Sequence, residues 1–131
     1  MTEELQAENL QASLTVQSLD RSVQWYCEAL GFVEDRRHER EGRLIAVSLR
    51  AGMVRILLTQ DNGAKGIDRQ KGDGFSLQLT THQSVDDLAV RILSYGTALD
   101  TEPTTAPWGV RILRVCDPDG FRWTISMPTA G

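Results

Sequence analysis

The residues best suited to chemistry in this chain lie in one short segment near its C-terminal end. The sequence PWGVRILRVCDPDGFRWTIS, residues 107–126, has two runs of β-forming residues on either side of an Asp-Pro-Asp-Gly turn, and it therefore predicts a β-hairpin. Arg114 and Arg122 alternate with the apolar Val115 and Trp123, so we expect both guanidinium groups to project from one face of the hairpin. There they can bind an anionic or carbonyl group of a ligand.

Other side chains of the segment have less specific roles. Arg111 has the opposite phase and is predicted to be structural. Trp108 is interpreted either as an aromatic platform at the mouth of a pocket or as a packing residue at a strand start. Cys116 has no histidine partner in the pattern and shows no Cys-x-x-Cys spacing with Cys27, so we expect two reduced, unreactive thiols.

Composition and charge limit the classes of protein that need to be considered. Of the 131 residues, 40% are hydrophobic and 24% are charged, which is ordinary for a soluble globular domain. The formal net charge of −4 disfavours nucleic-acid binding, for which a basic face is typical. No apolar run approaches the ~18 residues of a membrane span, and the acidic opening residues lack a signal-peptide core. We therefore expect a cytoplasmic protein that binds neither nucleic acid nor a membrane.

The predicted elements occur twice in the same order. The first set comprises a strand at 12–17, a helix at 18–31, and strands at 32–40, 43–50 and 53–60. The second set comprises a strand at 75–81, a helix at 84–96, and strands at 97–102, 110–116 and 121–126. The predicted fold class is α+β, with two βαβββ modules, each a mixed sheet with a helix on its outer face. We treat 1–131 as one domain, with module one at about 10–60, a polar, glycine-rich linker at 61–74 and module two at about 75–128.

Each predicted sheet has one apolar face and one mixed face. Leu14 and Val16 alternate with polar residues in the first strand, and Leu77 and Leu79 do so in the fifth. The apolar face should pack against the helix, because a sheet covered by one helix buries only that face. The mixed face either lines a concave pocket for a small molecule or is exposed to water.

Two segments carry a resemblance to a known family. LTVQSLDRSVQWYCEALGF, residues 14–32, and PWGVRILRVCDPDGFRW, residues 107–123, resemble the signature segments of the vicinal oxygen chelate superfamily. That superfamily includes glyoxalase I, extradiol dioxygenases, fosfomycin-resistance enzymes and bleomycin-binding resistance proteins, and the likeness covers about residues 10–128. It implies paired βαβββ modules whose curved sheets enclose a cavity, which a homodimer often completes.

The resemblance also implies four inward positions that carry His or Glu in the metal-dependent members. In this chain they fall on Gln11, Leu57, Ser76 (Phe75 if the register slips by one) and Thr124. None of these side chains is a good ligand for a divalent ion. The two histidines, His38 and His82, lie away from these positions, and we assign them surface or capping roles. We therefore expect no bound metal and no other cofactor.

The interpretation that remains is the metal-free branch of the family. The PWG-x-R sequence resembles the antibiotic-binding resistance proteins, and no Ser-His-Asp, Cys-His or paired-carboxylate arrangement indicates catalysis. We predict a metal-independent, dimeric protein that binds a small molecule. The predicted binding residues are Gln11, Ser13, Leu57, Ser76, Gln78, Trp108, Arg114, Arg122 and Thr124. Two alternatives stay open: a glyoxalase-like lyase or dioxygenase-type metalloenzyme with atypical ligands, and a non-catalytic accessory domain.

Overall fold

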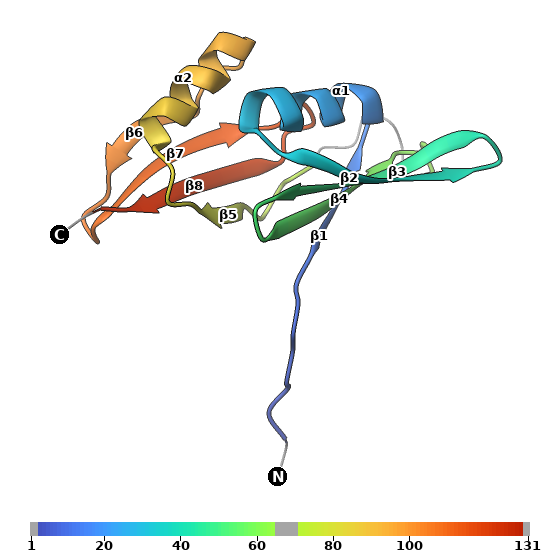
Figure 1. Cartoon of the computed structure of the whole chain (residues 1–131), viewed down its shortest axis with the longest axis horizontal. Coiled ribbons are helices and arrows are strands. Elements are labelled where there is room, and N and C mark those ends of the chain that lie inside the picture. Colours follow the sequence, from blue (N-terminus) through green and yellow to red (C-terminus); the bar gives the residue numbers. More distant parts are fainter. Residues whose placement is uncertain (1–2, 65–70, 130–131) are drawn as a thin grey trace.

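Two βαβββ modules follow one another along the chain (Figure 1). The structure, a computed structural model, describes residues 3–64 and 71–129. Module one contains β1 (Ala12–Val16), α1 (Leu19–Trp25), η1 (Tyr26–Leu30), β2 (Val33–Arg40), β3 (Arg43–Ala51) and β4 (Val54–Gln60). Module two contains β5 (Leu77–Thr80), α2 (Val85–Tyr95), β6 (Thr101–Thr105), β7 (Val110–Cys116) and β8 (Arg122–Pro128). The predicted α+β fold with two repeated modules is thereby confirmed.

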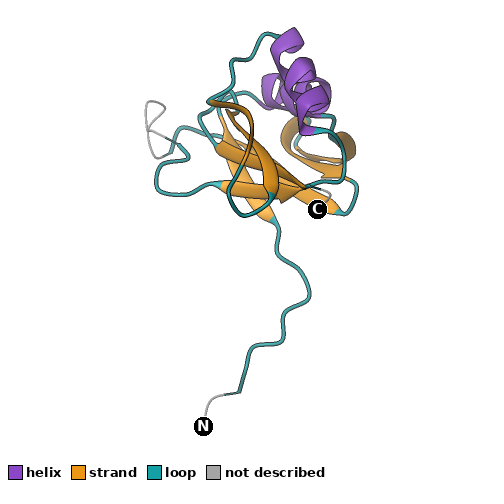
Figure 2. Ribbon diagram, turned by 90° about the vertical axis from the view of Figure 1, so that its left-hand side faces the viewer, coloured by secondary structure: helices purple, strands orange, loops and turns teal. Residues whose placement is uncertain are grey.

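The two sheets share one topology. Their strand orders are β1-β4-β3-β2 and β5-β8-β7-β6, so each places its first strand parallel to its last at one edge. Ser13 pairs with Leu57 in the first sheet, as Gln78 pairs with Thr124 in the second. Both helices lie on the same side of the sheets (Figures 1 and 2), which leaves the opposite face of each sheet without a helix.

The helices begin and end where the sequence predicts. The Ser18 and Ser84 hydroxyls accept hydrogen bonds from backbone N–H groups three residues further on, and these caps satisfy donors in the first turn. Gly31 and Gly96 end the helices with φ angles of 94° and 108°, a conformation that favours glycine. One feature was not predicted: the first helix widens into the π-helical turn η1, where the Tyr26 carbonyl accepts from the N–H groups of residues 31 and 32.

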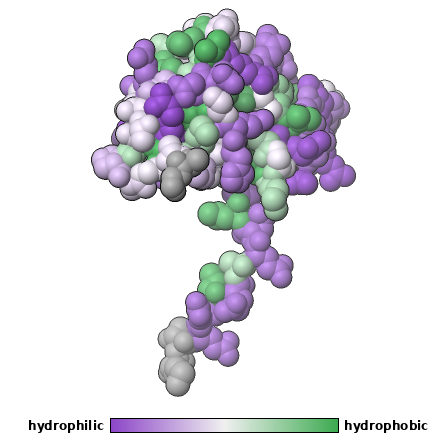
Figure 3. Space-filling model, turned by 60° about the vertical axis from the view of Figure 1, so that its left-hand side comes forward, coloured by the Kyte–Doolittle hydropathy of each residue, from purple (hydrophilic) through white to green (hydrophobic). Residues whose placement is uncertain are grey.

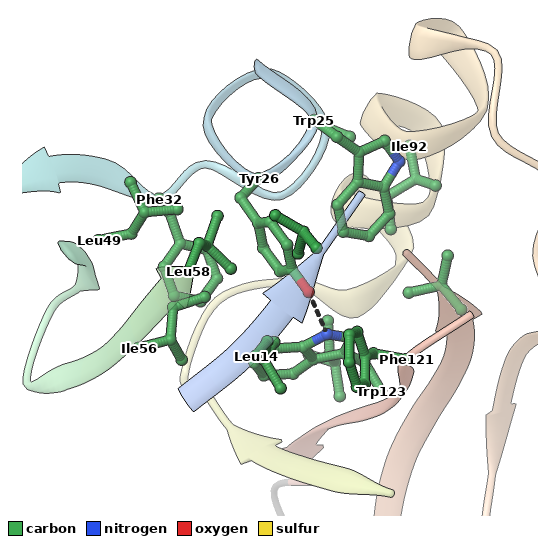
Figure 4. Packing of buried hydrophobic residues seen from close by; sticks show 14 of the residues in the cluster. Leu14, Trp25, Tyr26, Phe32, Leu49, Ile56, Leu58, Ile92, Phe121 and Trp123 are labelled. Atoms are coloured by element: carbon green, nitrogen blue, oxygen red, sulfur yellow. Dashed lines mark hydrogen bonds between the residues drawn. The ribbon is translucent and has the colours of Figure 1, made fainter. Parts of the chain in front are cut away.

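The modules share one hydrophobic core beneath the helices (Figure 4). Tyr26 is fully buried in it and contacts Trp25, Phe32 and Trp123 edge-on, with ring centroids 4.9, 5.6 and 5.8 Å apart. The Tyr26 hydroxyl accepts a hydrogen bond from Trp123 Nε1 (3.0 Å) and donates one to Asp117 Oδ2 (2.7 Å). Tyr26 belongs to module one and both of its partners to module two, so the contact fixes the modules relative to each other.

One predicted strand is placed wrongly. The sequence suggested 97–102, whereas β6 spans Thr101–Thr105. Residues 97–100 instead form the return from α2: the Thr97 N–H bonds back to the Ile92 carbonyl. Pro103, which cannot donate to a ladder, is tolerated because β6 is an edge strand with an irregular register.

The linker predicted at 61–74 is described only in part, because residues 65–70 lie outside the described residues. Its described ends are held together by charge. Lys71 Nζ lies 2.8 Å from an Asp61 carboxylate oxygen and 3.6 Å from one of Asp119, and all three side chains are nearly buried. The contact ties both ends of the linker to the turn between β7 and β8.

The N-terminal segment, residues 3–11, extends away from the body of the molecule (Figures 1 and 3). Its side chains are exposed, Leu10 almost completely. In residues 3–64 and 71–129, no helix has the length and apolar character needed to cross a membrane.

Candidate functional site

The helix-free face of the second sheet carries a hollow of about 690 Å³. Strands β5, β7 and β8 supply most of its wall, together with the segments that lead into β5 and β6. The lining residues are Phe75, Ser76, Gln78, Asp100, Arg114, Cys116, Arg122, Trp123 and Thr124.

Strand register explains why these side chains meet. Gln78, Thr124 and Arg114 are paired across three adjacent strands and form one row on the open face. Cys116 pairs with Arg122 in the next row. The residues between them, such as Val115, point to the helix side and are buried. The alternation read from the sequence therefore places Arg114 and Arg122 on the open face, as predicted.

The two arginines differ in their surroundings. Arg122 donates from Nη2 to the Gly72 carbonyl oxygen (3.1 Å), which holds its guanidinium against the described end of the linker. Gly72 itself lies against the hairpin turn: a Cβ there would be 2.5 Å from the Gly120 carbonyl oxygen, so no larger residue fits without displacing backbone. The Arg114 guanidinium has no hydrogen bond or ion pair with any residue among 3–64 and 71–129.

A thiol and a carboxylate meet at the rim of the hollow. Cys116 Sγ donates to Asp100 Oδ2 at 3.0 Å. Burial, reinforced by this bond and by the charge of Asp100, raises the pKa of the Cys116 thiol to about 11. The thiol is thus protonated at neutral pH and is a poor nucleophile, in agreement with the unreactive role expected for it.

The hairpin that carries both arginines is anchored at its turn. Asp117 Oδ1 accepts from the N–H groups of Asp119 and Phe121, while its other oxygen accepts from the Tyr26 hydroxyl. Burial raises the pKa of Asp117 above its ordinary value, against the opposing effect of these hydrogen bonds. The Asp119 carboxylate in turn accepts from the Gln17 N–H at 2.9 Å. The Asp-Pro-Asp-Gly turn is therefore structural and fixes the hairpin to module one.

The residues predicted from module one do not join this hollow within a single chain. Ser13 and Leu57 lie side by side on the helix-free face of the first sheet, and Gln11 lies in the exposed segment before β1. Of the four positions expected to surround one hollow, Ser76 and Thr124 line it, whereas Gln11 and Leu57 are elsewhere. The phase of Ser76 matches that of Gln78, and Phe75, the register alternative, also contributes to the wall.

The remaining tryptophan and arginine candidates divide between surface and structure. Trp108 is 71% exposed in the turn before β7 and does not line the hollow. Arg111 makes a two-pronged ion pair with Asp86 at the start of α2, at 2.7 and 2.8 Å, so its structural role holds. Trp25 is buried and donates from Nε1 to the Thr97 hydroxyl.

Neither histidine approaches the hollow. His38, on β2, lies 3.4 Å from the Ser48 hydroxyl across the first sheet. His82 lines a second depression, of about 830 Å³, between the end of η1, the β3–β4 turn and the start of α2. The apolar lining of that depression includes the fully exposed Met53 and the buried Phe32.

Sequence reasoning missed Asp100 and treated Phe75 only as a register alternative. Asp100 is 16 residues from Cys116 in the chain, and its N–H bonds to the Arg114 carbonyl. Only the position of β6 could have revealed this contact, and β6 was misplaced by four residues at its start. Phe75 precedes β5 and packs near Phe121, with centroids 6.0 Å apart.

The fold and site define a class of proteins built from two βαβββ modules, with a hollow on the helix-free face of a sheet. Comparison with known sequences identifies the family. The model of the Glyoxalase/Bleomycin resistance protein/Dioxygenase superfamily matches residues 10–125, and the chain belongs to this superfamily. The resemblance read from the two sequence segments is thereby confirmed.

Individual relatives are more distant. Catechol-2,3-dioxygenase from Bacillus subtilis is 27% identical over 112 residues, which cover 83% of this chain but 37% of the length of that protein. Among solved structures, TioX from Micromonospora sp. ML1 superposes with a TM-score of 0.75 at 20% identity, covering 93% of this chain and 99% of that one. A virulence protein from Salmonella typhimurium gives 0.72 at 22% identity, covering 96% and 100%. These similarities at low identity establish the fold.

The residues of the hollow do not fit the metal that the family implies. Its oxygen donors are hydroxyls, an amide and one carboxylate that already accepts from a thiol, and two guanidinium groups share the space. Hydroxyls and amides are weak ligands on their own, and cationic neighbours oppose a divalent cation. Within residues 3–64 and 71–129, no three His, Cys, Asp or Glu side chains lie close enough to hold a metal ion.

Proposed function

We propose that the protein binds a small molecule in the hollow of module two, without a metal ion. The observation that carries this proposal is the composition of the wall: two guanidiniums, two hydroxyls and an amide around a concavity of about 690 Å³, with the aromatic ring of Phe75 at its edge. Ligand sites combine such apolar surface with a few converging polar groups that fix orientation. Affinity comes from burying the ligand, and the polar groups select its chemistry.

A homodimer is part of the proposal. The helix-free faces of both sheets lie on the same side of the molecule, opposite the helices, and the hollow lies on the face of the second sheet. A second copy laid on this side would cover the hollow and increase the buried area of a ligand. We also expect the protein to act in the cytoplasm, where Cys27 and Cys116, both free thiols, stay reduced.

The test uses nuclear magnetic resonance on isotope-labelled protein stripped of metal with EDTA. Three probes, 2-naphthol, 2-naphthoate and bleomycin, are titrated to millimolar concentration. We expect at least one probe to shift the backbone amide signals of Gln78, Arg114 and Thr124, while the signal of Val47, buried in the other sheet, stays in place. The proposal is wrong if no probe shifts the hollow signals, or if they shift only after a divalent metal is restored.

A second candidate is a metalloenzyme with atypical ligands, favoured by the similarity to catechol-2,3-dioxygenase. Elemental analysis of protein purified without chelator, together with a catechol-cleavage assay after addition of Fe²⁺ or Mn²⁺, separates the two. We expect sub-stoichiometric metal and no cleavage. Stoichiometric metal that is lost on replacing Thr124 would instead assign the hollow to metal chemistry. An accessory domain, the third interpretation, requires that the hollow bind none of the probes.

A further inference from the structure

We propose that the hollow selects a flat, apolar molecule carrying a carboxylate, which Arg114 and Arg122 bind together. This inference rests on the proposed function and names the ligand class of the same site. Arg114 on β7 lies opposite Thr124 on β8, and Arg122 is two residues before Thr124 on β8. The two arginines are therefore diagonal neighbours on one sheet face. Diagonal positions lie about 7–8 Å apart, within reach of one carboxylate for two long side chains.

The hollow carries positive charge that its own residues do not neutralise. The described lining residues include one carboxylate, Asp100, and its Oδ2 accepts from the Cys116 thiol. The Arg122 guanidinium donates to a backbone carbonyl, which carries no charge, and the Arg114 guanidinium has no partner among the described residues. Like charges that face each other across strands destabilise a sheet, and a bound anion relieves that repulsion.

In the first sheet, an acidic side chain of the protein itself lies between two neighbouring arginines. Arg50 and Arg55 are paired across β3 and β4 on the helix-free face of the first sheet. Asp35, from β2, lies between them, 2.8 Å from Arg55 and 3.9 Å from Arg50.

In the second sheet the acid at the corresponding place is Asp100, because Thr101 pairs with Arg114 as Arg36 pairs with Ser48. Asp100 accepts from the Cys116 thiol and forms no ion pair with an arginine among residues 3–64 and 71–129. One carboxylate beside two guanidinium groups leaves one positive charge without a counter-charge, and we infer that the ligand supplies it.

The apolar part of the ligand has a surface to occupy. Phe75 lines the hollow, is 46% exposed, and packs near Phe121 with the two rings tilted and their centroids 6.0 Å apart. An exposed ring of this kind offers a face for stacking a second flat ring. Around the carboxylate, Gln78 and Thr124 can donate further hydrogen bonds. A cationic ligand such as bleomycin is disfavoured by the same two guanidiniums.

The experiment compares two probes of equal shape, 2-naphthoate and its neutral analogue 2-naphthamide. Dissociation constants are measured by calorimetry for the wild type, for Arg114→Gln, and for Arg40→Gln as a control. Arg40 lies at the exposed end of β2, so its replacement makes the same change in net charge away from the hollow. Circular dichroism verifies that both variants are folded.

We expect the wild type and Arg40→Gln to bind naphthoate at least tenfold more tightly than naphthamide. The reason is that a hydrogen bond between charged groups increases affinity by about tenfold or more. Arg114→Gln should lose this preference while its affinity for naphthamide stays the same. Equal affinities for acid and amide in the wild type, with the hollow amides shifted by both, overturn the inference and leave the proposed function intact. If the hollow amide signals are shifted by neither of these compounds, nor by 2-naphthol or bleomycin, both the inference and the proposed function are refuted. A preference that survives in Arg114→Gln refutes the role of that arginine.

Discussion

Removal of the Tyr26 hydroxyl is the most informative test of how the two modules are joined. In Tyr26→Phe the ring still fills its place among the aromatic side chains, but the hydroxyl no longer donates to Asp117 or accepts from Trp123. The change therefore isolates two polar contacts in a site that water does not reach, because Tyr26 is fully buried.

The expected loss follows from the two partners. A hydrogen bond to a charged group contributes about 1.5–3 kcal/mol, and a buried donor left unsatisfied costs about 1–3 kcal/mol. The two costs are not additive here, since Asp117 keeps its two backbone donors on the other oxygen. We expect Tyr26→Phe to lower the free energy of unfolding by about 3 kcal/mol, a large part of the total of about 5–15 kcal/mol for a domain.

Urea unfolding followed by tryptophan fluorescence measures this loss of free energy. The same transition is followed by circular dichroism, and coincidence of the two curves verifies two-state unfolding. Tyr95→Phe is the matched control, because Tyr95 is partly exposed at the end of α2. A loss below about 1 kcal/mol for Tyr26→Phe, or one equal to that of the control, would show that these hydrogen bonds do not join the modules.

The same hydroxyl gives a dependence on pH. Burial, and then the charge of Asp117, raises the pKa of Tyr26 well above its ordinary value of 10.0, so the folded state keeps the proton that the unfolded state releases. Its contribution is complete below pH 10 and is lost as pH rises from there towards the raised pKa. The stability of the wild type should therefore fall more steeply above pH 10 than that of Tyr26→Phe. Parallel curves would contradict this assignment.

Three further outcomes are expected. In urea unfolding, Gly72→Ala should lower the free energy of unfolding by several kcal/mol more than Gly42→Ala. Both glycines have φ near +75°, but only at Gly72 would a Cβ clash with neighbouring backbone atoms. Equal losses of about 1 kcal/mol for the two variants would show that this close contact does not matter. Iodoacetamide should alkylate Cys116 at pH 8 about a hundredfold more slowly than a thiol with the ordinary pKa of 9.0, and Asp100→Asn should partly restore the rate; mass spectrometry of the labelled peptide measures both, and an ordinary rate would be contradictory. Trp108→Ala should leave the dissociation constant of 2-naphthoate within about twofold in calorimetry, because the exposed indole does not line the hollow; a larger increase would show that Trp108 contacts the ligand.

Local signals in the sequence predicted much of this molecule. The serine caps, the terminating glycines and the Asp-Pro-Asp-Gly turn each act over a few residues, and the structure places them as expected. The strand predicted at 110–116 coincides with β7. Alternation along that strand was sufficient to place Arg114 on the open face, because side chains in a strand point to opposite faces in turn.

What the sequence could not give depends on contacts between distant segments. The separation of Leu57 from Thr124 is set by how the modules pack, and that packing depends on Tyr26 meeting a hairpin about 90 residues away. The pairing of Asp100 with a thiol depends on the register of an irregular edge strand. No periodicity encodes either contact, since each one joins elements whose own patterns are complete without it.

The aromatic contact between the modules also limits how such chains can be recombined. Each half supplies one side of it: η1 brings the phenol, and the hairpin brings the indole and the buried carboxylate. A first half transplanted from a relative with a different residue at this place would leave that carboxylate and indole facing a foreign helix. Chimeras of this chain should therefore take η1 and the Asp-Pro-Asp-Gly turn from the same parent.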